Sequence, residues 1–187
     1  MSTFTLIKRD GTTEERPFQI ISGREMISPH IARAEFGEHD EAGRLRTGVP
    51  IRALEPLVEL FEAVRAAVGQ PIPIHSGYRS VAKQQELYQR DIREHGGKPS
   101  GEVARPDCAP HTYGAAMDLG LPRGLNAARF AAIIRQTSVK LGLPQPRTGW
   151  RMYGGRFVHM DMVFLCFEPY TNKPNPAPRS WRSGVSW

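Results

Sequence analysis

Two side chains that can bind a metal ion stand close together in the middle of the sequence. His111 and Asp118 are separated by Gly114 and two alanines, in the run A-P-H-T-Y-G-A-A-M-D-L-G-L (109–121). A bulky side chain at Gly114 would crowd the space between the imidazole and the carboxylate. The part A-A-M-D-L-G-L is typical of a short buried strand, so Asp118 would lie on a largely apolar element. A buried carboxylate is costly unless it is paired, hydrogen-bonded or bound to a metal.

A third ligand would have to come from elsewhere in the chain. Histidine and aspartate are both ordinary zinc ligands, and a catalytic zinc site has three protein ligands plus one open position for water. The best candidate is His159, the single imidazole in the apolar run R-F-V-H-M-D-M (156–162). The sequence therefore predicts a Zn²⁺ ion held by His111, Asp118 and His159. The alternative is that these are two core histidines and a buried aspartate with ordinary hydrogen-bond partners.

Three motifs occur in an order that resembles a known enzyme family. Residues 76–80 read S-G-Y-R-S, residues 111–118 fit H-x-x-G-x-A-x-D, and residues 157–161 read F-V-H-M-D. Together they are similar to the zinc D-Ala-D-Ala carboxypeptidases and related peptidoglycan endopeptidases (VanY-type), whose fold is shared with the Hedgehog signalling domain. The resemblance implies a zinc metallopeptidase that hydrolyses amide bonds in peptidoglycan stem peptides, as a D,D-carboxypeptidase or an endopeptidase, including the phage-type lysins.

The resemblance also assigns substrate contacts. It places Arg79 in the active site, where a guanidinium group offers two parallel hydrogen bonds to a carboxylate such as a peptide C-terminus or a D-Glu side chain. The alternative for Arg79 is that it caps a loop or pairs with a structural acid. Gln84 lies one helical turn after Ser80 and is expected to face the same cleft and bind substrate.

Hydrolysis needs a group that transfers a proton to the leaving amine. Many members of the family carry a carboxylate three residues before the last ligand, or a histidine two residues before it. Here Arg156 and Phe157 stand at those positions, and neither can act as a base. Asp161 would point to the same face of a strand as His159, and we expect it either to act as the catalytic base or to orient an imidazole. The missing base also motivates an alternative function, a non-catalytic zinc-containing module that binds the cell wall or a protein.

The elements that must position these groups follow from hydrophobic periodicity. Apolar residues recur every three or four positions from Leu54 to Val68 and predict a helix that has Pro56 in its first turn and ends at Gly69. A short strand over 72–75 leads into Gly77, and Ser80 caps a second helix. That helix would turn five residues inward: Val81, Gln84, Leu87, Tyr88 and Ile92. A third helix is predicted over 125–141.

The remaining segments complete the predicted fold. Residues 3–7 and 14–21 form a hairpin around Asp10-Gly11, residues 28–36 begin a helix capped by Ser28, and residues 94–110 form a long loop that walls the cleft. Residues 143–150 are an extended connection, and residues 151–165 form a hairpin around Gly154-Gly155. We expect an α+β fold with one domain over 1–187: a small antiparallel sheet carries the metal ligands, and helices pack on one side. The N-terminal hairpin or arm spans 1–27, and a Pro- and Trp-containing arm spans 168–187.

Composition limits the function classes. Hydrophobic residues make up 40% and charged residues 24%, as in a soluble globular protein. The 25 Lys and Arg outnumber the 19 acids, giving a net charge of +6 that favours an anionic partner such as a wall polymer, although a merely solvated basic surface explains it equally well. No block of five or six basic residues occurs, which argues against nucleic acid.

The two cysteines and the N-terminal residues bear on the cellular compartment in which the protein is made and acts. Cys108 and Cys166 lack the close spacing of a cysteine zinc site; Cys108 is expected to be structural or a free thiol, and a disulfide between them stays open. The first ten residues lack the apolar core of a signal peptide, and no apolar run approaches the roughly 20 residues of a membrane span. We expect a monomer that is made in the cytoplasm and acts on the cell wall after release or export.

Overall fold

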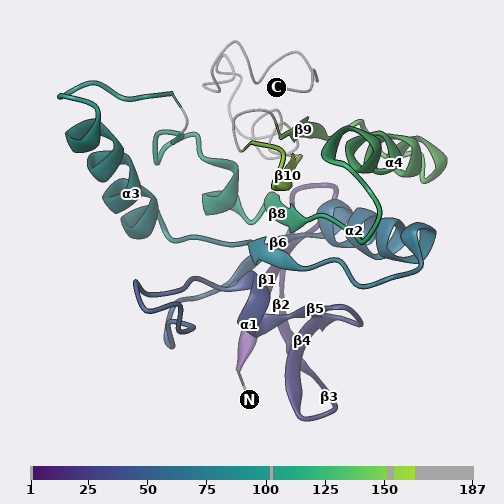
Figure 1. Cartoon of the computed structure of the whole chain (residues 1–187). Helices are drawn as coiled ribbons and strands as arrows, with labels where there is room; N and C mark the ends of the chain where they lie inside the picture. Colours follow the sequence, from purple (N-terminus) through teal and green to yellow (C-terminus); the bar gives the residue numbers. More distant parts are fainter. Residues whose placement is uncertain (1, 102, 151–153, 163–187) are drawn as a thin grey trace.

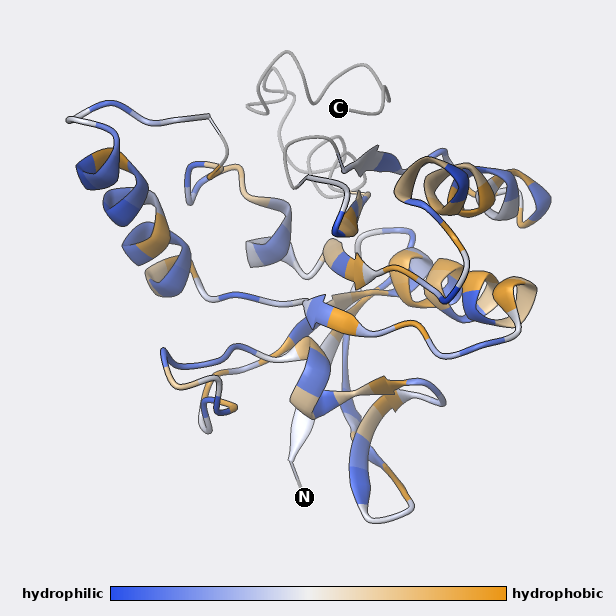
Figure 2. Ribbon diagram, viewed as in Figure 1, coloured by the Kyte–Doolittle hydropathy of each residue, from blue (hydrophilic) through white to orange (hydrophobic). Residues whose placement is uncertain are grey.

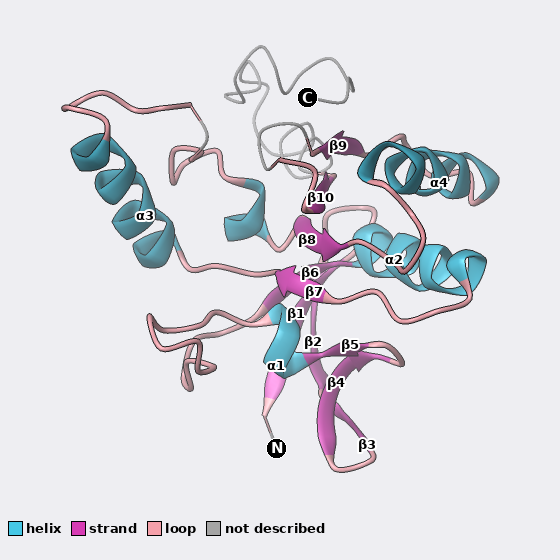
Figure 3. Cartoon of the chain, viewed as in Figure 1, coloured by secondary structure: helices cyan, strands magenta, loops and turns pink. Residues whose placement is uncertain are grey.

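The computed structural model describes residues 2–101, 103–150 and 154–162. Three small sheets form the centre of the α+β fold, and two long helices, α2 (Glu55–Val68) and α4 (Ala127–Lys140), pack against each other on one side of them (Figures 1 and 3). A third long helix, α3 (Val81–Glu94), lies on the opposite side. The predicted fold class is confirmed, and the position of α3 adds a wall that the sequence did not indicate.

The N-terminal strands are part of the core. Strand β1 (Thr3–Ile7) pairs antiparallel with β2 (Thr13–Pro17), so the predicted hairpin is confirmed. Strand β1 also pairs in parallel with β6 (Arg52–Leu54), and its Phe4 and Leu6 are buried. The predicted return strand ends early at Pro17, because Phe18 turns inward and packs on Phe4, with 5.2 Å between the ring centres.

Beyond Phe18 the chain forms a second sheet, and only its last strand lies wholly in the segment 28–36 where a helix was predicted. It contains β3 (Gln19–Ile21), β4 (Arg24–Ser28) and β5 (Ile31–Ala32) in that order. The helix predicted from Ser28 is wrong: only the four-residue α1 (Arg33–Phe36) follows β5. Ser28 is instead the last residue of β4, and its hydroxyl donates to Glu62 at 2.5 Å.

The two packed helices follow their predicted patterns. Helix α2 has Pro56 in its first turn and ends at Gly69, whose φ of +70° is the left-handed conformation that glycine adopts most readily. Leu57, Leu60 and Phe61 are among its fully buried residues. In α4 the side chain of Asn126 caps the first turn, and Phe130 and Ile134 face the core. Figure 2 shows hydrophobic residues concentrated on α2 and the nearby strands.

A four-stranded antiparallel sheet lies between the two groups of helices. Its strands are β7 (Ile74–Ser76), β8 (Ala116–Gly120), β10 (Phe157–Asp161) and β9 (Arg147–Gly149), in that spatial order. The predicted strands β8 and β10 are confirmed. The partner of β10 is β9, which lies in the segment predicted as an extended connection. The first half of the predicted hairpin, at 151–153, lies outside the described residues, as do Cys166 and the predicted C-terminal arm.

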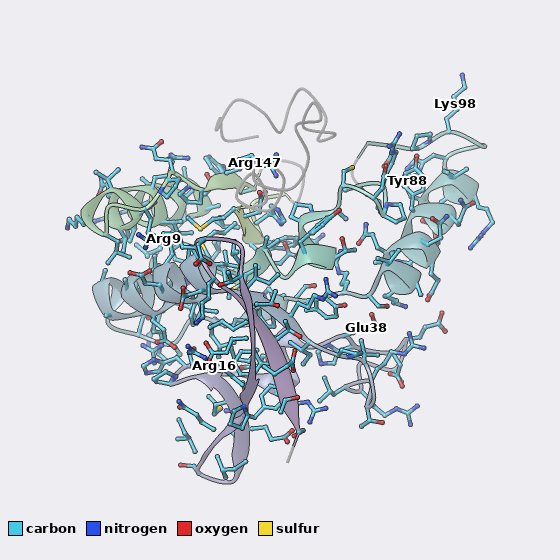
Figure 4. The ribbon with its side chains drawn as sticks, turned by 180° about the vertical axis from the view of Figure 1, so that it is seen from behind. Arg9, Arg16, Glu38, Tyr88, Lys98 and Arg147 are labelled. Atoms are coloured by element: carbon cyan, nitrogen blue, oxygen red, sulfur yellow. The ribbon has the colours of Figure 1, made fainter. Side chains whose placement is uncertain are left out.

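Helix α3 packs against a polar loop and contributes little to the apolar core, as its largely hydrophilic colouring shows (Figure 2). Ser80 caps it as predicted, accepting from the backbone N–H of Lys83 at 3.1 Å. The predicted inward position of Val81 is wrong, since its side chain is 60% exposed, whereas Gln84 and Asp91 are buried. Seen from behind, Tyr88 of α3 and Lys98 of the loop lie far from α2 and α4 (Figure 4). No described helix has the length and apolar character needed to cross a membrane.

Candidate active site

Strand register brings two of the predicted ligands together. Asp118 on β8 and His159 on β10 are direct cross-strand partners, and His159 Nδ1 lies 2.8 Å from Asp118 Oδ1. Their side chains share one face of the sheet because alternate residues of a strand point the same way. Both side chains are buried.

The third predicted ligand reaches this face from a short 3₁₀ turn, η1 (Pro110–Tyr113), which directly precedes β8. Gly114 ends the turn with φ of +66°. A Cβ atom there would lie 2.2 Å from the carbonyl oxygen of Arg52, so glycine is required by the close approach of the β6 backbone. This corrects the expectation that Gly114 leaves room between the imidazole and the carboxylate.

The structure places one nitrogen or oxygen atom from each of His111, Asp118 and His159 within 4.8 Å of the others. His111 Nδ1 lies 2.5 Å from the carbonyl oxygen of Gly77. A carbonyl oxygen only accepts hydrogen bonds, so Nδ1 carries the proton, and Nε2 faces Asp118 Oδ2 at 3.5 Å.

The second imidazole is held in a similar way. His159 Nε2 lies 3.1 Å from Asp161 Oδ2, which leaves Nδ1 directed at Asp118. Metal-ligating histidines usually donate their other N–H to a carboxylate or a carbonyl oxygen. The donor set of two oriented imidazoles and one carboxylate therefore fits a zinc ion.

Burial and the neighbouring charges shift the pKa values of all three candidate ligands. Burial lowers the pKa of His111, and the neighbouring Arg79 lowers it further. Burial opposes ionisation of Asp118, yet the two imidazoles hold the pKa of this carboxyl group well below its ordinary value. For His159 burial also acts against the charged form, but the hydrogen bonds to Asp118 and Asp161 prevail and raise its pKa to about 9. Asp118 is therefore ionised at neutral pH, as a metal ligand must be, whereas a bound metal ion would have to displace the Nδ1 proton of His159, because a ligating imidazole is neutral.

The predicted substrate residues lie beside this group. Arg79 donates through Nε and Nη2 to Ser76 Oγ at 3.1 and 2.9 Å, and Nη2 is 3.3 Å from Asp118 Oδ2. Its Nη1 is 3.4 Å from Gln84 Oε1, and Gln84 Nε2 donates to the carbonyl oxygen of Ala104 at 2.7 Å. Gln84 therefore connects Arg79 to the loop that follows α3.

These side chains line one cavity of about 220 Å³. Arg79, Gln84, His111, Asp118 and His159 supply its polar lining. The predicted loop wall is confirmed by Val103, Ala104 and Ala109, and the other apolar lining residues are Leu87, Pro110 and Phe157. Asp118 is the sole carboxylate among the described residues that line this cavity.

The surroundings of Asp161 differ from those that a catalytic base facing the substrate would need. It is fully buried, it is absent from the described cavity lining, and Arg147 donates to its Oδ1 through Nε at 2.8 Å and through Nη2 at 2.6 Å. Of the two predicted roles, this arrangement favours orientation of the His159 imidazole. Sequence reasoning missed Arg147, although a buried Asp161 required a cationic or hydrogen-bonding partner. Arg147 comes from β9 and is labelled in Figure 4.

Comparisons with known proteins identify the family of the chain. The model of the VanY family, described as D-alanyl-D-alanine carboxypeptidase, matches residues 47–140. A bifunctional D-Ala-D-Ala dipeptidase and D-Ala-D-Ala carboxypeptidase, VanXYC of Enterococcus gallinarum, is 30% identical over 99 residues; the match covers 51% of this chain and 46% of that protein. The chain thus spans about half the length of this relative. The L-Ala D-Glu endopeptidase ChiX of Serratia marcescens superposes with a TM-score of 0.40 at 20% identity, over 58% of this chain and 79% of that one.

Proposed function

Because this chain belongs to the D-alanyl-D-alanine carboxypeptidase family, we propose that it is a zinc-dependent peptidase that hydrolyses an amide bond in peptidoglycan stem peptides. The observation that carries the proposal is the convergence of His111, Asp118 and His159 in a cavity that also contains Arg79. Cleavage at a terminal D-Ala and cleavage within the stem are both compatible with the site.

The metal ligands in this proposal are His111 Nε2, Asp118 and His159 Nδ1. A zinc ion held by them would supply Lewis-acid activation of water and of the scissile carbonyl group. The carbonyl oxygen of Gly77 and the carboxylate of Asp161 hold the two imidazoles in the orientation that this requires. Fixed orientation matters because donors that are already in place need no reorganisation during the reaction.

The other cavity residues have separate tasks. The guanidinium group of Arg79 would bind a carboxylate of the stem peptide, and Gln84 would hold Arg79 and the loop at Ala104 in place. Phe157, Val103 and Leu87 give the cavity an apolar wall. Such a wall excludes water and strengthens the electrostatic interactions within the cavity.

The substrate places the site of action at the bacterial cell wall. We propose that the chain reaches the wall after release or export, as a phage-type lysin would. Its partner there is the stem peptide.

Metal analysis combined with mass spectrometry of digested muropeptides tests the proposal. We expect one zinc ion per chain, and release of D-Ala or of a stem fragment that stops on chelation and resumes when zinc is added. Substoichiometric zinc together with no hydrolysis after zinc addition would contradict the proposal.

The non-catalytic zinc module remains the second candidate, because Asp118 is the sole carboxylate of the described cavity lining. That candidate predicts stoichiometric zinc and binding to sacculi without turnover of any stem peptide. Measuring binding and turnover on the same preparation separates the two functions.

A further inference from the structure

The positive charge of the molecule originates in one segment. Residues 119–160 contain seven of the 25 Lys and Arg and none of the 19 acids, whereas the other 18 basic residues are balanced by 19 acids. The two acids that flank this segment, Asp118 and Asp161, are both buried. Every formal charge that the described part of the segment exposes is therefore positive.

Exposed basic residues in the N-terminal half are mostly neutralised by neighbours. Arg9 lies 3.1 Å from Glu59, Arg24 lies 3.5 Å from Glu35, and Arg44 lies 2.9 Å from Asp40. Arg123, Arg129 and Lys140 are also exposed, but no ion pair within the described part of the chain involves them. Among the described residues, none supplies these three cations with a counter-charge in an ion pair.

Helix α4 spaces two of these cations along one face. Arg129 and Lys140 are 11 positions apart on the helix, which places them about 20° apart around its axis and about 16 Å apart along it. This distance exceeds the screening length of about 8 Å at physiological salt. The two cations therefore suit two separate charges on an extended anion better than one small ion.

The remaining exposed residues of α4 are uncharged. They are Ala128, Gln136 and Val139, so the helix exposes neither a carboxylate nor an aromatic ring. Arg135 lies between the two cations in sequence, but it is only partly exposed to solvent. Its Nη1 donates to Thr148 Oγ1 at 2.8 Å, and its guanidinium group lies over the ring of Trp150. None of Arg123, Arg129 and Lys140 lines the catalytic cavity.

We propose that the α4 face, defined by Arg129 and Lys140 on the helix together with Arg123 in the turn before it, binds an anionic phosphodiester polymer of the bacterial cell wall and holds the enzyme close to its substrate. The proposal rests on the proposed function, which brings the chain to the wall. A guanidinium group can form two parallel hydrogen bonds to a phosphate group. A polymer with repeating phosphates supplies several negative charges, which the spaced cations of α4 can bind separately. Nucleic acid carries the same phosphate groups, but α4 offers no exposed aromatic side chain on which bases would stack.

The test compares the full chain with the variant R123E/R129E/K140E by co-sedimentation. The probes are sacculi that retain their phosphodiester polymer and the same sacculi after chemical removal of it. We expect the unmodified protein to bind the polymer-bearing sacculi at least tenfold more tightly than the stripped ones. The variant should lose this difference. The slope of a plot of log binding constant against log salt concentration should become less steep by about two to three. Hydrolysis of soluble muropeptides should be equal in both proteins.

A control variant with the same change in charge is R9E/R24E/R44E, which should keep the preference for polymer-bearing sacculi. The inference is overturned if the control loses binding to the same extent, if stripped sacculi bind equally well, or if duplex DNA binds as tightly at the same salt. Should the reversed variant fail to fold by circular dichroism, R123Q/R129Q/K140Q takes its place with the same expected loss of preference. If soluble muropeptides are not cleaved while the preference persists, the proposed hydrolase function fails and the α4 face stands.

Discussion

His159 and Asp118 are 41 residues apart in sequence but directly opposite each other on paired strands, with Nδ1 of the one 2.8 Å from Oδ1 of the other. This pairing fixes the separation of two of the three proposed ligands through backbone hydrogen bonds. A flexible loop would not hold them with the same accuracy. The position of the proposed metal site is therefore a property of the β8–β10 ladder.

Replacement of His159 by alanine removes one of three proposed ligands, and we expect stoichiometric zinc binding and muropeptide hydrolysis to be lost together. Elemental analysis after gel filtration and a mass-spectrometric assay measure the two effects. The variant His39→Ala serves as a histidine control, because His39 is absent from the described cavity lining and its Nε2 lies 2.8 Å from the carbonyl oxygen of Ala34. Full zinc occupancy in His159→Ala would show that the ligand set is wrong.

Replacement of Asp161 by asparagine tests its role. If Asp161 orients His159, zinc affinity should fall about 10- to 100-fold, measured by competition with a chromophoric chelator. If it is the catalytic base, zinc affinity should stay unchanged while kcat falls by about 10²- to 10⁴-fold. We expect the first result, and Asp107→Asn, an exposed acid paired with Arg105, should change neither quantity.

Replacement of Arg79 by lysine keeps the charge but removes the planar fork. We expect kcat/KM for stem peptides to fall about 10- to 100-fold, the equivalent of one charge-assisted hydrogen bond of roughly 1.5–3 kcal/mol. Zinc content should be unchanged. Arg90→Lys, on the exposed surface of α3, is the matched control. Equal kcat/KM in Arg79→Lys and the unmodified protein would leave Arg79 with a structural role only.

Alanine at Gly114 should destabilise the fold by more than about 2 kcal/mol, because left-handed strain of about 1–2 kcal/mol adds to a steric clash. The clash is with the backbone of Arg52. Gly124 has a φ of +80° but no atom within 4 Å of an added Cβ, so Gly124→Ala should show the strain alone. Urea denaturation of both variants measures the difference, and equal losses of stability would contradict the backbone contact.

Glu38 should make folding stability depend on pH in the acid range. Burial opposes its ionisation, but hydrogen bonds from the backbone N–H of Ser80 and from Arg46 prevail and hold its pKa below 4.5. A depressed pKa stabilises the folded state above pH 4.5, and this contribution is lost as pH falls through the folded-state pKa. The free energy of unfolding of Glu38→Gln should therefore fall less steeply below about pH 5. Parallel urea titrations at several pH values check this, and identical slopes would refute it.

Sequence patterns predicted those elements that are stabilised by contacts between residues close together in the sequence. The helix over 54–68, its end at Gly69 and the cap at Ser80 follow from periodicity and from side-chain hydrogen bonds within one or two turns. The buried run around Asp118 and the motif around His159 were also readable, because a polar ligand on an apolar strand stands out in a sequence. The candidate ligands could thus be named before any coordinates, whereas Arg79 was named from the family resemblance and Gln84 from its place one helical turn after Ser80.

Tertiary contacts decided the rest. Ser28 ends strand β4 and donates to Glu62, 34 residues away. Asp161 is bound by Arg147, which lies in the segment predicted as an extended connection. Gly114 is glycine because a distant backbone passes beside it. The sequence alone determined which side chains can do chemistry, since residue type and short spacing are local properties. Which of them meet, and which partners hold them, depended on strand pairing and burial between segments far apart in the chain, which no local pattern encodes.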